Sequence, residues 1–99
     1  MKVAATSSHH PPDLGEVRVP TILRLGPYRF FFWAHESRET REPPHIHVVS
    51  ADRHAIFWLD PVKHRKSWGY TDPEIARLGR IVSTHRAELL RHWHDFFRA

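Results

Sequence analysis

The 99-residue chain contains no cysteine, and this absence removes several classes of site at once. Without thiols there is no disulfide framework, no thiolate metal centre and no cysteine nucleophile. The sequence also lacks any apolar run near the roughly 18 residues that a membrane-spanning helix needs. Residues 1–8 lack the apolar core of a signal peptide. These absences predict a cytoplasmic protein with no membrane partner.

The chain also has only a small excess of positive charge. Its 15 Lys and Arg residues are opposed by 11 Asp and Glu, which gives a formal net charge of +4. Such a mild excess favours an acidic protein or a nucleic acid as partner without requiring either. The apolar fraction of 40% is enough for one packed core. We therefore expect a single domain at residues 19–99. Residues 1–18, which show no periodic apolar pattern, are expected to be a disordered N-terminal extension.

The pattern of apolar residues predicts an α+β fold built on a small antiparallel sheet of three to four strands. Aromatic and β-branched residues concentrate in four short runs, at residues 20–25, 28–33, 45–50 and 54–59. Turn-forming residues separate the first two runs and the last two. The basic segment that follows, residues 62–70, is expected to be a linking loop.

Residues 72–97 are expected to form one long C-terminal helix that packs against the sheet. Thr71 suits the N-cap position, and Glu74 three residues later completes a capping box. Apolar residues then recur at steps of three or four, which is typical of an amphipathic helix. Weak helix formers at residues 79–84 predict a bend or a split there.

The stretch Glu42-Pro43-Pro44-His45-Ile46-His47 is the most informative part of the sequence. Two prolines enforce an extended chain just before a predicted strand, and the spacing of two places His45 and His47 on one face. This pair could act as acid and base toward a phosphoryl group. It could also bind a divalent metal such as zinc. The candidates for a third ligand are His54 across the hairpin, His35 or Glu42 in the preceding loop, and His92 or His94 on the helix. Alternatively, the histidines only form hydrogen bonds on the sheet. No other cofactor is expected.

The aromatic run at residues 28–33 is a second candidate surface. Both of its faces are apolar, because every position from 30 to 33 is aromatic. A helix can cover one face, so Phe31, Trp33 and the neighbouring Arg29 are candidates for contacts with a partner on the other. Two alternatives stay open: these aromatic residues belong to the core, or they bind nucleic acid together with interleaved arginines.

In chain order, these motifs resemble a family of small bacterial proteins, the domain-of-unknown-function family 4160. The resemblance covers residues 19–97 and depends on Pro20-Thr21-Ile22, on Gly26-Pro27-Tyr28 and above all on Pro43-Pro44-His45-Ile46-His47-Val48. It implies an interaction module whose protein partner is encoded by a neighbouring gene, in a toxin–antitoxin-like pair. Whether the protein is an enzyme stays open. A histidine-dependent phosphoesterase or nuclease, a weak nucleic-acid-binding protein and a homodimer remain alternatives.

Overall fold

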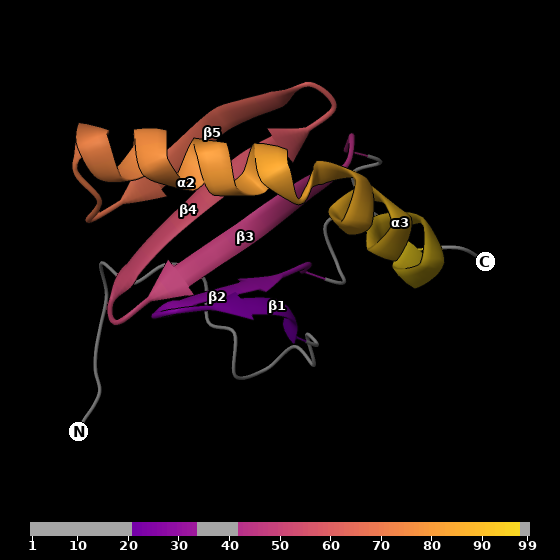
Figure 1. The fold of residues 1–99 in the computed structure, drawn as a ribbon, viewed down its shortest axis with the longest axis horizontal. Helices are drawn as coiled ribbons and strands as arrows, with labels where there is room; N and C mark the ends of the chain where they lie inside the picture. The colour runs from indigo at the N-terminus through magenta and orange to yellow at the C-terminus, as the bar shows by residue number, and fades with distance from the viewer. Residues whose placement is uncertain (1–20, 34–41, 98–99) are drawn as a thin grey trace.

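The computed structural model of the chain describes residues 21–33 and 42–97. They form a five-stranded antiparallel sheet followed by two helices (Figure 1). The strands lie in chain order across the sheet: β1 (Thr21–Leu25), β2 (Tyr28–Phe31), β3 (His45–Ser50), β4 (Arg53–Leu59) and β5 (Val62–Trp68). The helices are α2 (Asp72–Thr84) and α3 (Arg86–Phe97). The predicted α+β class is confirmed, whereas the predicted extension at 1–18 lies outside the described residues.

Two-residue turns join three of the four neighbouring strand pairs. Gly26-Pro27 connects β1 to β2, Ala51-Asp52 connects β3 to β4, and Asp60-Pro61 connects β4 to β5. Gly26 and Ala51 adopt φ angles of 56° and 53°, the left-handed conformation that tight hairpin turns favour. The two hairpins predicted from the sequence are therefore present, and a third follows them.

The fifth strand corrects the prediction that residues 62–70 form a linking loop and that the sheet has at most four strands. The basic run Lys63-His64-Arg65-Lys66 suggested a solvated connection, yet it lies within β5 at the edge of the sheet. Long charged side chains suit an edge strand because they discourage unwanted pairing with other sheets. A register shift between Ile56 and Phe57 interrupts the ladder that β5 forms with β4.

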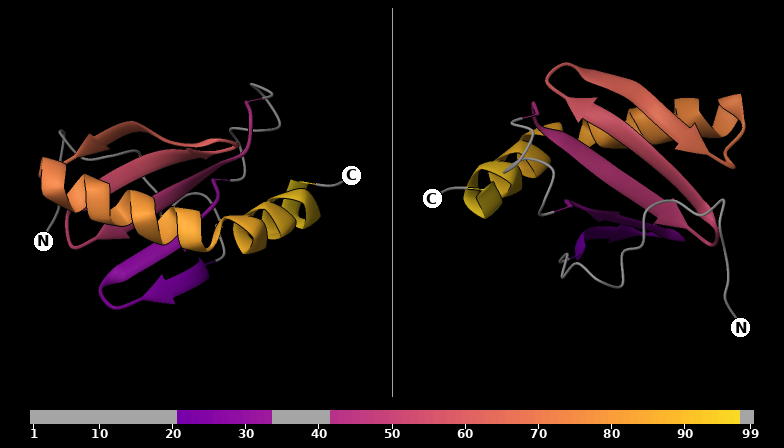
Figure 2. Two further views of the ribbon diagram at one scale, coloured as in Figure 1. Left: turned by 45° about the horizontal axis from the view of Figure 1, so that its top comes forward. Right: turned by 180° about the vertical axis from the view of Figure 1, so that it is seen from behind.

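The C-terminal segment forms two helices rather than one long helix. The split predicted near residues 79–84 occurs at His85, between the end of α2 and the start of α3. The Thr84 hydroxyl donates a hydrogen bond to the Arg80 carbonyl at 3.0 Å, and such bonds tend to bend helices. As a result α2 lies across β4 and β5, while α3 turns away near the end of the sheet (Figures 1 and 2).

The hydrophobic core lies between the helices and one face of the sheet. Its buried members are Phe30, Phe32, Ile46, Val48, Ala55, Phe57, Leu59, Leu78, Val82, Leu89 and Trp93. The two-residue period of a strand places Ile46 and Val48 in this core and His45 and His47 on the opposite face, as predicted. None of the described helices combines the length and apolar character that crossing a membrane requires.

The connection from β5 to α2 depends on a glycine. Gly69 has a φ of +88°, and a Cβ atom there would lie 2.6 Å from Cγ of Arg53. Gly26 also has a positive φ, but a Cβ atom at that position would meet nothing within 4 Å. The two positions therefore share the backbone constraint and differ in steric room.

We expect Gly69→Ala to lower the free energy of unfolding by more than Gly26→Ala. Each substitution places an alanine in the left-handed backbone conformation, which costs roughly 1–2 kcal/mol. Only Gly69→Ala also makes the new Cβ atom overlap with Arg53. Urea titration of both variants measures the difference. Equal losses would contradict the close approach of Arg53 to residue 69.

Candidate functional site

His45, His47 and His54 form a row of imidazole rings on one face of the sheet. At the His45 end, the row meets Trp93 of α3 with a centroid distance of 5.2 Å. Ring centroids are 5.4 Å apart between His45 and His47 and 5.2 Å apart between His47 and His54. The β3–β4 register sets this order, since Val49 pairs with His54 and lies two positions beyond His47. All three side chains are buried, at 1%, 0% and 0% exposure. The structure thus brings together the residues named as catalytic and metal candidates.

Hydrogen bonds fix the rings within this row. Nδ1 of His47 and Nε2 of His54 lie 2.9 Å apart, so one of these two nitrogens donates its proton to the other. Nδ1 of His45 donates to the carbonyl of Pro43 at 2.9 Å. Nε2 of His45 lies 3.8 Å from the Glu42 carboxylate. The double-proline segment therefore orients an imidazole as well as directing the chain into β3.

Aromatic rings pack around the histidine row. Phe31 stacks on His47 with a centroid distance of 5.3 Å and an interplanar angle of 18°. Arg29 lies over the Phe31 ring at 5.0 Å, and Trp33 meets His47 edge-on at 5.8 Å. Of the three predicted interaction residues, Phe31 is fully buried, while Arg29 and Trp33 are half-buried. The Phe31 side chain has no accessible surface in this arrangement. Two further rings, on β4 and β5, meet the ends of the row: Trp58 and Trp68.

This geometry is typical of a polar network that fixes a core. An acid and a base must reach a substrate, whereas these imidazoles are buried in an aromatic layer. In the part of the chain that the structure describes, no three His, Asp or Glu side chains are arranged to hold a metal ion. Nδ1 of His47 and Nε2 of His54 instead face each other. We interpret the row as structural in this arrangement.

We expect His47→Ala to lower the free energy of unfolding by about 2–4 kcal/mol, from the cavity and the lost hydrogen bond. An accessible catalytic histidine could be removed without such a loss. His94→Ala is the control, because His94 is exposed on α3, and it should change stability by less than about 0.5 kcal/mol. Chemical denaturation measures both. Similar stabilities for the two variants would contradict the structural role of His47.

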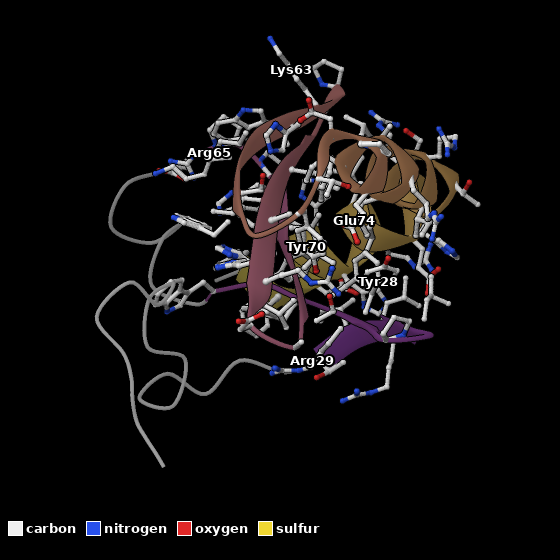
Figure 3. All side chains as sticks on the ribbon, turned by 90° about the vertical axis from the view of Figure 1, so that its left-hand side faces the viewer. Tyr28, Arg29, Lys63, Arg65, Tyr70 and Glu74 are labelled. Carbon is white, nitrogen blue, oxygen red and sulfur yellow. The ribbon has the colours of Figure 1, made fainter. Side chains whose placement is uncertain are left out.

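The edge strand β5 carries a second candidate site, which the sequence analysis missed. Lys63, His64 and Lys66 are exposed, Arg65 is half-buried, and the strand contains no carboxylate. Among the described residues, 21–33 and 42–97, no carboxylate forms an ion pair with Lys63 or Lys66. Figure 3 shows Lys63 projecting at the edge of the sheet and Arg65 on the face away from α2. The four-residue basic run was the available signal, but assigning it to a loop hid its place on a sheet edge.

Contacts with the tryptophans hold two of these cations against the histidine face. The Arg65 guanidinium lies over Trp58 at 5.0 Å and forms two hydrogen bonds with the Glu42 carboxylate, at 3.2 and 3.3 Å. Nζ of Lys66 lies 5.5 Å from the centroid of Trp68. Arg65 is therefore already neutralised by an ion pair, and the lysines carry the uncompensated charge of the strand.

An open groove of about 570 Å³ separates β5 from α2. No aspartate or glutamate lines it. Phe57 of β4, Val62 of β5 and Ile75 of α2 contribute apolar surface to the groove. The basic residues that line it are Lys63 and His64 of β5 and Arg80 of α2. The groove therefore suits an apolar group attached to something negatively charged.

Gly79 keeps this groove open on the helix side. A Cβ atom at residue 79 would lie 3.6 Å from Cε2 of Phe57, an ordinary contact distance. Alanine would therefore fit, and it would favour the helix by about 1 kcal/mol. Packing therefore does not require glycine at residue 79, and the missing side chain leaves additional space in the groove.

Comparison with known families identifies the family to which this chain belongs. The family model for a domain of unknown function, DUF4160, matches residues 28–94. The chain belongs to this family. The match runs from β2 into α3, so the DUF4160 domain includes both the histidine row and β5, and the resemblance seen in the sequence is confirmed. The searches of curated proteins and of solved structures each found no match.

In this DUF4160 domain, the start of α2 is anchored to the β3–β4 hairpin. The predicted capping box is present, with hydrogen bonds of 3.3 Å from the Glu74 amide to the Thr71 hydroxyl and 2.8 Å from the Thr71 amide to the Glu74 carboxylate. The backbone bond from Thr71, more than the nearby Arg53, lowers the pKa of Glu74. Burial raises the pKa of Tyr70, whose hydroxyl lies 2.7 Å from that of Ser50. The Tyr70–Ser50 contact and a 2.9 Å hydrogen bond that Arg53 donates to Glu74 hold the start of α2 against the β3–β4 hairpin.

The lowered pKa of Glu74 makes the anchor dependent on pH. Ionised Glu74 stabilises the fold above its ordinary pKa of 4.5, and this contribution is lost as the pH falls through the lower pKa of the folded state. We expect Glu74→Gln to be less stable than the natural chain at neutral pH, with the difference shrinking in acid. Thermal unfolding across a pH series tests this. A difference that stays constant would contradict the capping interaction.

Proposed function

We propose that this DUF4160 domain is a protein-interaction module that binds an acidic segment of a partner at β5. The observation that carries the proposal is the strand itself: seven residues at a sheet edge, four consecutive basic residues and no carboxylate. Following the family resemblance, we propose that the partner is the product of a neighbouring gene and that the two form a toxin–antitoxin-like pair.

The outer edge of β5 favours a protein over a nucleic acid. No described strand pairs with that edge, so its outward amides and carbonyls are available to another polypeptide backbone. The adjacent groove has apolar walls, which suit a side chain better than a phosphate. The formal net charge of +4 is modest for a surface that binds nucleic acid mainly through phosphate contacts.

The same charges disfavour a homodimer formed through β5. Pairing β5 with the β5 of a second copy would bring two carboxylate-free basic strands together. Like charges on directly opposed strands are destabilising. A partner with acidic residues gains from the same charges, so a different chain fits this edge better than a second copy does.

The histidine row supports β5 from behind in this proposal. The ring of His54 packs against Trp68 at the end of β5 with a centroid distance of 5.1 Å, and Trp58 lies beneath Arg65. The row therefore helps to fix the strand that meets the partner. We do not propose the histidine-dependent phosphoesterase or nuclease, because no described feature exposes the imidazoles to a substrate.

Affinity purification of the tagged full chain from its own host, at moderate salt, tests the proposal. The natural chain should retain one stoichiometric protein, and the double variant Lys63→Glu/Lys66→Glu should lose it. Arg77→Glu/Arg91→Glu makes the same change in charge at exposed helix positions and should retain it. Melting temperatures show that each variant is folded.

Two results would overturn the proposal. The first is a natural chain that purifies without a protein partner or with nucleic acid alone. The second is equal loss of the partner from both double variants, because this would attribute binding to net charge rather than to β5.

A further inference from the structure

We infer, on the basis of the proposed function, that the partner binds as an additional strand on β5 in which acidic and apolar residues alternate. The apolar side chains of this strand would enter the groove between β5 and α2. Its acidic side chains would lie on the other face of the sheet, beside the lysines.

The two faces of β5 differ in the way that such a pattern requires. Val62 and His64 pair with β4 residues that belong to the core between sheet and helices, and both line the groove. Lys66 pairs with Ile56, which lies on the histidine face, and Arg65 lies over that face as well. Side chains of an added strand alternate between the same two faces. Every second one would therefore meet an apolar groove, and the others would meet cations.

The groove fits apolar side chains of the added strand. Phe57 and Ile75 provide apolar surface in its walls, and Gly79 leaves space that a side chain would fill. Lys63 pairs with Trp58, whose ring meets His45 on the histidine face, so this lysine offers charge to the carboxylates that flank the buried group. Lysines on an edge strand also prevent aggregation. That role alone explains neither a groove without carboxylates nor a helical glycine that packing does not require.

A synthetic nine-residue peptide that alternates glutamate and valine is the direct probe. It is titrated into the isotope-labelled full chain, and backbone amide resonances are followed by NMR. We expect the resonances of residues 62–68 and of groove residues to shift. Two matched peptides should bind at least about tenfold more weakly: one with lysine in place of glutamate, and one with serine in place of valine.

Gly79→Met tests the groove itself. Methionine favours a helix more than glycine does, so the melting temperature should not fall, while its side chain occupies the groove and weakens the glutamate–valine peptide at least about tenfold. Ala87→Met is the control, because Ala87 is exposed on α3 and does not line the groove. Should Gly79→Met fail to fold, Gly79→Ala and the serine-containing peptide test the same contact.

The outcomes separate this inference from the proposed function. No binding of the glutamate–valine peptide, shifts confined to residues outside β5 and the groove, or equal binding of all three peptides would overturn strand addition. If the host partner is nevertheless retained by the natural chain and lost from Lys63→Glu/Lys66→Glu, the module function stands and only the binding mode is wrong. If the host partner is absent, the function itself fails.

Discussion

Burial of both faces of the β3–β4 pair is the constraint on which the rest of the structure depends. One face carries Ile46 and Val48 into the core beneath the helices. The other carries imidazoles at 0–1% exposure, and polar rings can be buried at low cost only when their nitrogens find hydrogen-bond partners. The bond between His47 and His54, and the one from His45 to the Pro43 carbonyl, provide such a partner for one nitrogen of each ring. The double proline, the histidines and the aromatic rings thus act together to bury this face of the sheet.

A sheet buried in this way concentrates its binding capacity at its edges. The centre of the sheet is occupied by core on one side and by the histidine row on the other, so side chains such as Phe31 have no free surface. β5 differs, because one of its edges has no described neighbour and none of its residues is fully buried. The charges on this strand make it a poor match for itself and a good match for an acidic chain. Specificity then follows from the same lysines that keep the edge from aggregating.

Local sequence signals predicted most of the fold. The strands at 45–50 and 54–59 were predicted within one residue, as was the start of α2, because alternation and capping are local rules. The proximity of His47 and His54 followed from the same alternation across one hairpin. β5 was missed because a run of four basic residues satisfies the pattern of a loop as well as that of an edge strand. Only the neighbouring β4 decides between them. The break at His85 was misplaced by one residue, since weak helix formers indicate a region and not the residue at which hydrogen bonding changes.

The candidate site was less predictable, and the reason is burial. Spacing placed His45 and His47 on one face, but it could not show that aromatic rings enclose them, and a buried imidazole has a different use from an exposed one. The groove depends on α2 and β5, which meet only in the folded chain. Gly79 illustrates this: in the sequence it is a weak point of a helix, and in the structure it shapes a surface.

Hydrogen exchange of the backbone amides, compared between the free chain and its complex with the co-purified partner, tests the central claim most directly. An added strand hydrogen-bonds to outward amides of β5, so exchange within residues 62–68 should slow on binding while exchange in α3 stays the same. Protection confined to α3, β1 or the β3–β4 turn, with β5 unchanged, would contradict the claim that this edge is the binding surface.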